Sequence, residues 1–466
     1  MNVLNIQTKS ITSAAFVLGA ASGFSALLGF LRDRLLASRF GAGNELDVYY
    51  AAFRIPDFIS MVLIMGSISA AVVPIFSSHL IKSREEAWNF FSNLLNLILL
   101  FSVLISAVLF IFTPQLMNLI TPGFSGEKKD LVVLLTRIMF LSPIILGTSN
   151  IITSVLQVFR RFLITSLAPI MYNVGIISGI LFFAPRMGIV GLAWGVVLGA
   201  ALHFLIQLPV LFKVGFKIKK VLSFADSGFR EVLRLTIPRS IGLASTQINF
   251  IVVTAIASTL SAGSLTVFSL SESLSRPLLI LTGISFSTAA FPQLALSFSK
   301  EKRGKFLDIY SKTFSKIVLF IVPLSLALFF LRNFIVDIIL RVGKFGLADS
   351  RLTAACLAMF AIGLFARSLI LLTVKAFYAI RDTKTPALAS ILAMAVNIVL
   401  SFLFIHLLSF QNPFQKLLTS FLGLTGFEGI KIIGLPLALS VSAIFQILIL
   451  FILFKRKINK FDEKNP

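Results

Sequence analysis

The chain has 466 residues, of which 57% are hydrophobic and only 13% are charged, and its mean hydropathy is +0.97. A soluble globular protein carries about 25% charged residues, so this composition excludes that class and indicates a polytopic α-helical membrane protein. The net charge of +23 would suit a nucleic-acid-binding protein in solution. In a membrane protein, however, basic residues mark topology beside anionic headgroups, and we expect no nucleic-acid partner.

Apolar stretches long enough to cross a bilayer, which takes roughly 20 residues, occur along the whole chain. The first ten residues lack the basic start of a secretory signal, so we expect the first stretch to stay in the protein. We predict about twelve transmembrane helices. They cover residues 10–32, 47–78, 88–119, 130–157, 163–184, 188–212, 232–258, 264–297, 306–331, 350–378, 386–408 and 432–454.

Lysine and arginine concentrate on one side of these predicted spans, which is the cytoplasmic side by the positive-inside rule. That side includes both chain ends, so both termini are predicted to be cytoplasmic. The most basic connection, 213–234, falls midway along the chain. We therefore predict two six-helix lobes with a linker and a tail: an N-terminal lobe over 1–212, a basic cytoplasmic linker over 213–231, a C-terminal lobe over 232–454 and a cytoplasmic tail over 455–466.

The two halves of the chain resemble each other at an offset of about 220 residues. Residues 37–59 and then 67–74 resemble residues 257–280 and then 285–292, with ASRFGAG matching ASTLSAG at the start. A second pair joins 157–173 to 376–397. Two six-helix repeats would have the same orientation in the membrane. Parallel repeats of this kind are a transporter design with the substrate site between them.

Charged residues inside or at the ends of spans are the candidate site residues, because each costs about 2.5–3.5 kcal/mol at the bilayer centre. Arg32 and Asp33 end the first predicted helix, and Asp47 opens the second after the turn at 41–43. One interpretation is an interfacial salt bridge whose arginine extends to water. The other is that Arg32 faces a central cleft and binds an anion, oriented by Asp33 and Asp47. The guanidinium fork suits phosphate.

Three further arginines lie in spans: Arg54, Arg239 beside a proline in the seventh helix, and Arg276 beside a proline in the eighth. Glu272 precedes Arg276 by four residues, so the two could simply pair. Alternatively, Arg276 points inward from the second half, opposite Arg32 and Arg54. On that hypothesis Arg32, Arg54, Arg239 and Arg276 form a clamp for an anionic group such as a pyrophosphate, and Glu272 helps to orient it.

Gln247 and Asn249 are polar residues in the middle of the seventh span, where they either join helices by hydrogen bonds or line a cavity. Residues 160–161 and 382–386 read as equivalent cytoplasmic turns with a structural role. The sequence has no P-loop and no nucleophile–base pattern. Its three histidines are scattered along the chain and do not have the spacing of metal ligands. We therefore expect a transporter rather than an enzyme, without a cofactor or metal, driven by a coupling ion, the membrane potential or the substrate gradient.

Several stretches together resemble the lipid II flippase family (MurJ, or MviN) of the MOP transporter superfamily. They lie at 29–58, TPGF at 121–124, 160–176, QIN at 247–249, VGKF at 342–345 and KAFYAIRDTKTPA at 375–387. The resemblance implies a two-lobed, MATE-like helical bundle in the bacterial cytoplasmic membrane. It implies a flippase that moves undecaprenyl-pyrophosphate-linked peptidoglycan precursor from the inner to the outer leaflet by alternating access. Cavity arginines would engage the pyrophosphate, and cell-wall synthesis enzymes could be partners.

The chain departs from the family pattern at several charged positions. The family usually has an arginine six residues before the Arg32–Asp33 pair, and this chain has Ala26 there. The second-helix stretch that usually carries an arginine and a Glu-Gly motif has Ser60 and Met65 instead, and Glu272 stands where arginine is usual. The family commonly has fourteen helices, and this chain has about twelve predicted. Two alternatives to lipid II transport therefore stay open: export of another polyprenyl-linked glycan or amphiphile by the same fold, and a non-transporting membrane scaffold for cell-wall enzymes.

Overall fold

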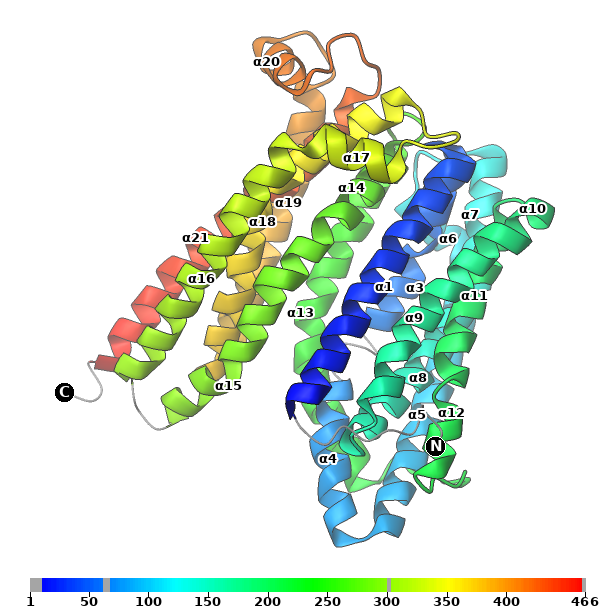
Figure 1. The fold of residues 1–466 in the computed structure, drawn as a ribbon, viewed down its shortest axis with the longest axis vertical. Coiled ribbons are helices and arrows are strands. Elements are labelled where there is room, and N and C mark those ends of the chain that lie inside the picture. Colours follow the sequence, from blue (N-terminus) through cyan, green and yellow to red (C-terminus); the bar gives the residue numbers. More distant parts are fainter. Residues whose placement is uncertain (1–10, 62–67, 300–302, 463–466) are drawn as a thin grey trace. The chain divides into compact units, whose positions relative to one another are not determined.

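The computed structural model describes residues 11–61, 68–299 and 303–462, and in those residues all regular structure is helical (Figure 1). The chain divides into two compact units. Unit 1 comprises Met1–Leu36 and Asn44–Ile251, and unit 2 comprises Ala37–Gly43 and Val252–Pro466. One division falls within the helix α1 (Ile11–Phe40) and one within the helix α13 (Ser227–Ser258), and the division between Gly43 and Asn44 lies after the end of α1.

Between those two helices, the described residues of unit 1 form eleven α-helices and the π-helical segment η3. These are α2 (Asn44–Ala52), α3 (Arg54–Ile59), α4 (Ile68–Lys82), α5 (Arg84–Ile111), α6 (Thr113–Ile120), α7 (Gly126–Met139), α8 (Leu141–Val158), α9 (Phe162–Ser178), η3 (Gly179–Phe183), α10 (Ala184–Met187), α11 (Val190–Leu205) and α12 (Leu208–Lys213).

Unit 2 continues the chain after α13 with longer helices. These are α14 (Ser264–Leu279), the π-helical η4 (Ile280–Ile284), α15 (Ser285–Ser299), α16 (Arg303–Phe330), α17 (Arg332–Leu340), α18 (Leu347–Ala379), α19 (Lys384–Leu407), α20 (Pro413–Leu422), the 3₁₀ segment η5 (Ile430–Ile433) and α21 (Gly434–Asp462).

Within the described ranges, nine helical stretches are long and apolar enough to cross a membrane. They coincide with nine of the twelve predicted spans, which confirms a multi-pass helical membrane protein. Two more predicted spans, 10–32 and 232–258, correspond to α1 and α13. Within α13, the stretch Ala244–Ser258 is a shorter apolar helix. The total of twelve stays a prediction.

The prediction of one continuous helix over 47–78 is wrong. The chain makes a turn at Phe53 between α2 and α3, and a further helix, α4, starts at Ile68. Pro56 gives a physical reason, because proline has no backbone N–H to donate to the carbonyl of Ala52 and its ring crowds that carbonyl. Hydropathy does not register such a break.

The internal repeat extends further than the two matching sequence pairs. The helices α5 and α16 each have 28 residues and begin about 220 positions apart. Each is followed by a short helix, α6 or α17, and then by a turn that ends in a buried phenylalanine, Phe124 or Phe345. Helix lengths and turn positions, more than residue identities, therefore carry the repeat.

The predicted basic linker is a structured segment. Helix α12 ends at Lys213, residues 214–226 are not helical, and α13 starts at Ser227. Asn93 of α5 forms two hydrogen bonds with the backbone of Ser223. Nδ2 of Asn93 donates to the carbonyl oxygen of Ser223 at 2.9 Å, and the N–H of Ser223 donates to Oδ1 of Asn93 at 2.6 Å. Asn96 donates to the carbonyl oxygens of Lys219 and Val221. These contacts fix the segment against α5.

Helices α9 and α11 of unit 1 pack through glycines spaced four apart. A Cβ added to Gly175 would lie 2.2 Å from the Cα of Gly199, and one added to Gly179 would lie 2.5 Å from the Cα of Gly195. Small residues at this spacing let two helix backbones approach closely in a membrane, where packing rather than hydrophobicity drives association. The two glycine pairs therefore set the distance between α9 and α11.

We expect Gly175→Ala to destabilise the protein by about 1–3 kcal/mol, because the new methyl group has to push α9 and α11 apart. The measurement is the thermal unfolding midpoint of the purified protein in detergent. Gly29→Ala in α1 is the matched control, since a Cβ there meets nothing within 4 Å. Equal midpoints for Gly175→Ala and the wild type would contradict the close packing.

The turn between α18 and α19 depends on one buried carboxylate. Arg381 adopts a left-handed backbone conformation, φ 61°, which ends α18. Asp382 then accepts hydrogen bonds from the backbone N–H groups of Lys384 and Thr385, each at 3.1 Å, and from the ammonium of Lys457. Burial raises the pKa of Asp382, but the hydrogen bonds from Lys457 and Thr385 outweigh burial and hold that pKa below its usual value.

A lowered native-state pKa means that the ionised Asp382 stabilises the fold at neutral pH and stops doing so as the pH falls through that pKa. We therefore expect Asp382→Asn to lower the unfolding midpoint at pH 7, and the difference from wild type to shrink between about pH 5 and pH 3. Parallel unfolding curves across this range provide the measurement. A difference that stays constant with pH would mean that the carboxylate charge does not matter.

Candidate functional site

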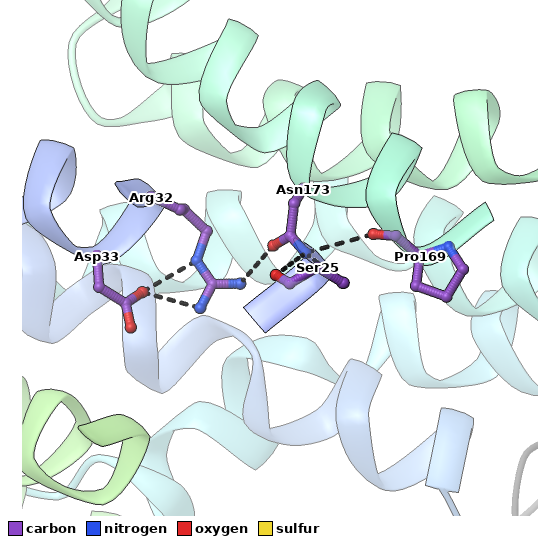
Figure 2. A network of polar contacts seen from close by, with 5 residues as sticks. All are labelled: Ser25, Arg32, Asp33, Pro169 and Asn173. Atoms are coloured by element: carbon purple, nitrogen blue, oxygen red, sulfur yellow. Dashed lines mark hydrogen bonds and ion pairs between the residues drawn. The ribbon is translucent and has the colours of Figure 1, made fainter. Parts of the chain in front are cut away.

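The prediction that Arg32 and Asp33 end the first helix is wrong, because α1 continues for about two more turns to Phe40. The charged stretch of α1 around these two residues forms a polar cluster in unit 1 that Figure 2 shows from close by. Arg32 donates from Nε and Nη2 to Oδ1 of Asp33, at 3.0 and 2.8 Å, and from Nη1 to Oδ1 of Asn173 at 3.3 Å. Asn173, in α9, in turn donates to Oγ of Ser25 at 3.2 Å. The Asp33 side chain is 3% exposed and that of Arg32 is 27% exposed. The guanidinium is therefore held in place but still accessible.

Aromatic hydroxyl groups surround this cluster. Tyr49 and Tyr50 of α2 and Tyr172 of α9 lie close enough to Arg32 to interact with it electrostatically. The rings of Tyr49 and Tyr50 are 5.5 Å apart in an edge-to-face arrangement. Charge interactions are stronger in such a surrounding than in water, because its effective dielectric constant is lower. An anion that reached Arg32 would therefore be attracted more strongly than at a solvated surface.

Asp47, which was expected to help orient Arg32, forms an ion pair with Lys128 from α7. Its Oδ2 lies 3.3 Å from Nζ of Lys128, and its side chain is 3% exposed. Lys128 also donates to Oδ1 of Asn44 at 2.8 Å, and its ammonium lies 3.9 Å from the centre of the Phe124 ring. The pair joins the start of α2 to α7.

We expect Lys128→Met to destabilise unit 1 by about 2 kcal/mol, because it leaves the buried Asp47 carboxylate without its cation. The double variant Asp47→Asn with Lys128→Met should recover most of that loss, since neither charge then remains. Unfolding midpoints of the wild type, both single variants and the double variant measure the coupling. Strictly additive effects would show that the pair contributes no interaction energy.

The other predicted site residues of unit 1 lie on α3 and α13. Arg54 begins α3, is partly exposed, and its guanidinium carbon lies 5.7 Å from the centre of the Phe250 ring. Gln247 and Asn249 are partly exposed on α13. The side chain of Arg239 and the residue Met65 lie outside the part of the structure that is described. Arg54 is thus placed next to the same stretch of α13 that carries Gln247 and Asn249.

In unit 2, Glu272 forms an ion pair with a residue other than Arg276, whose pairing with Glu272 was one of the two interpretations of the sequence. Its Oε1 lies 3.6 Å from Nη2 of Arg367, which belongs to α18, and the two side chains are 17% and 24% exposed. Arg276, one turn further along α14, is exposed. In this described part of unit 2, Glu272 therefore forms its ion pair with α18 and not with Arg276 four residues away.

Two residues of these clusters, Lys128 and Asn173, were not among the candidates from the sequence. Lys128 reads as an ordinary loop lysine in the sequence, and Asn173 as one more polar residue in a span. Arg367 was a candidate as a charge inside an apolar stretch, but the sequence assigned it no partner and no place in the predicted clamp. Their partners are 81, 141 and 95 positions distant in the sequence, which local patterns cannot register.

The chain matches a known family along almost its whole length. A family model described as "Lipid II flippase MurJ" matches residues 36–465. A "Probable lipid II flippase MurJ" of Thermotoga maritima is 31% identical over 389 residues, which cover 83% of this chain and 77% of that protein. The "Lipid II flippase MurJ" of Burkholderia cenocepacia is 27% identical over 414 residues, covering 87% and 79%.

Solved structures match the fold as well. One is described as "Lipid II flippase MurJ, inward closed conformation", with a TM-score of 0.76, 26% identity, and coverage of 96% of this chain and 90% of that one. A multidrug resistance transporter of the MATE family, in the MOP superfamily, matches with a TM-score of 0.75 at 13% identity, covering 95% and 96%. At that identity the second match concerns the fold alone.

Proposed function

The chain belongs to the MurJ family of lipid II flippases, and we propose on this basis that it carries lipid II from the inner to the outer leaflet of the bacterial cytoplasmic membrane by alternating access. It is a multi-pass membrane transporter rather than an enzyme. The observation that carries the proposal is the family match over residues 36–465. The Arg32–Asp33 pair lies a few residues before the start of that match.

The chemistry of such a substrate explains why a protein is needed. A pyrophosphate with an attached glycopeptide is large, polar and negatively charged, so its transfer through hydrocarbon is very unfavourable. The polyprenyl tail can stay in the lipid throughout. The protein therefore has to supply hydrogen-bond donors and positive charge for the headgroup along a path inside the membrane.

The cluster around Arg32 in unit 1 fits this requirement. Asp33 holds one edge of the guanidinium with two hydrogen bonds, and the 3.3 Å contact to Asn173 is the longest of the three. Exchange of that contact for a phosphate oxygen would give a shorter, charge-assisted bond. We propose Arg32 as the first pyrophosphate-binding residue, with Asp33 and Asn173 as the residues that position it, and Arg54 as a second cation of the same unit.

A second candidate is export of another polyprenyl-linked anion by the same fold. The observation that favours it is Glu272, which stands where the family usually has arginine and forms an ion pair with Arg367. Cytoplasmic termini, the coupling ion and contacts with cell-wall synthesis enzymes stay predictions.

We expect the wild-type chain to restore growth in bacteria depleted of their own lipid II flippase, and Arg32→Ala to abolish that rescue. The reason is that alanine removes the positive charge and the donors that would engage the pyrophosphate. The measurement is the amount of lipid II accessible on the outer leaflet, together with growth. Arg32→Lys should rescue only in part, since an ammonium keeps the charge but not the planar fork.

Arg186→Ala is the control, because Arg186 is an exposed arginine of the same unit in α10. Each variant has to be present in the membrane at the wild-type level. Absence of rescue by the correctly inserted wild type would exclude lipid II and favour the second candidate. Full rescue by Arg32→Ala would leave lipid II as the substrate but exclude Arg32 as its binding residue.

A further inference from the structure

Unit 2 contains a cluster of three charged residues inside its spans, and its charges do not cancel. Glu272 and Arg276 lie on α14, and Arg367 lies on α18. Arg276 and Arg367 are each more than about three helical turns from the ends of the spans Ser264–Ser299 and Leu347–Ala379. One carboxylate and two guanidinium groups leave a net positive charge, which is costly within a bilayer unless an anion or water is present.

Arg367 is held on two sides. Glu272 lies 3.6 Å from Nη2, and the guanidinium carbon lies 5.8 Å from the centre of the Phe360 ring, one of the aromatic residues between α14 and α18. Nη1, by contrast, is buried and has no hydrogen-bond partner in the described structure. A guanidinium N–H group that is removed from water without a partner is unfavourable, and an anion that accepted its hydrogen bond would remove that cost.

Arg276 adds the second positive charge. It is exposed and lies one turn after Glu272 on α14, and Glu272 is the residue that contacts Arg367. The two arginines are therefore neighbours, and their like charges repel. Two arginines that repel in a low-dielectric region are brought into balance by one anion that accepts hydrogen bonds from both. Carboxylates and phosphates have the right geometry for this, and a diphosphate has enough oxygens to serve two forks.

We propose that Arg367 and Arg276 form an anion subsite in unit 2 for the diphosphate of a polyprenyl-linked substrate, and that Glu272 is the positioning residue that holds Arg367. This proposal rests on the proposed function and adds a binding residue to it. Glu272 then does not repel the substrate as a free acid, because Arg367 neutralises it. The pair places a fixed guanidinium on α18, which contributes no residue to the clamp predicted from the sequence.

The test compares two ligands with the same tail, farnesyl diphosphate and uncharged farnesol, in binding to the purified full chain in lipid nanodiscs. The wild type should bind the diphosphate more tightly than the alcohol. Arg367→Gln should weaken diphosphate binding about tenfold, the effect of one lost charge-assisted contact, and leave farnesol binding unchanged. Arg341→Gln is the matched control, since Arg341 is an ion-paired arginine of the same unit outside this cluster.

Two further variants keep a charge in the span, so that they test the site even if Arg367→Gln does not fold. Arg367→Lys should lose part of the diphosphate preference, because lysine cannot form the forked contact. The exchange of the pair, Glu272→Arg with Arg367→Glu, should bind the diphosphate better than Arg367→Glu alone, since it returns a guanidinium beside Arg276.

The outcomes separate this proposal from the one on function. A wild type that binds farnesyl diphosphate no more tightly than farnesol would overturn recognition of a diphosphate by the protein, and with it the proposed substrate class. A wild-type preference that Arg367→Gln and Arg367→Lys both retain in full, as Arg341→Gln does, would overturn only the role of Arg367. Loss of farnesol and diphosphate binding together in the folded Arg367→Lys protein would also overturn it, because the effect would not depend on the anion.

Discussion

An arginine inside a membrane span needs hydrogen-bond partners from the protein or its ligand, because hydrocarbon offers none. This requirement decides the arrangement of the charged residues in the chain. Arg32 is held by Asp33 and Asn173, and Arg367 is held by Glu272. In both clusters the side chain of the carboxylate is less exposed than the side chain of the arginine, 3% against 27% for Asp33 and Arg32 and 17% against 24% for Glu272 and Arg367. The acid therefore helps to fix the position of the arginine in each cluster.

The two units reach this arrangement by different means, although they repeat one architecture. When Gly43 is matched to Gly263, Arg32 and Asp33 correspond to Val252 and Val253, so the second unit has no charge at that position. Its positive charge comes from α14 and α18 instead. The repeat preserves helix lengths and turns because these satisfy the backbone in lipid. Side chains inside the spans are free to differ as long as each buried charge finds a partner.

Close helix contact is the second structural requirement. In unit 1 it is met by glycines that bring the backbones of α9 and α11 together, and Asn173 lies on α9 just before the first of them, Gly175. The position of Asn173 relative to Arg32 therefore depends on how closely α9 can pack. In unit 2, α18 contacts α21 through a hydrogen bond from Oγ of Ser440 to the carbonyl oxygen of Met359, beside Gly363. Helix packing and site geometry are thus linked in both units.

The sequence by itself determined that this is a helical membrane protein of a lipid II flippase family, where most of its spans lie, and that its chain repeats. Apolar runs, basic connections and short motifs are local properties, and a bilayer makes them strong constraints on structure. Hydropathy gave the helix over 47–78 no boundary at Phe53, because it measures transfer to lipid and not the continuity of hydrogen bonds. Arg32 and Asp33 stood out as charged residues at the end of a predicted span, and they do contact each other.

Only the tertiary structure paired Asp47 with Lys128, Arg32 with Asn173 and Glu272 with Arg367. These partners come from helices far apart in the sequence, and which side chains meet depends on helix rotation and packing distance, which no local pattern encodes.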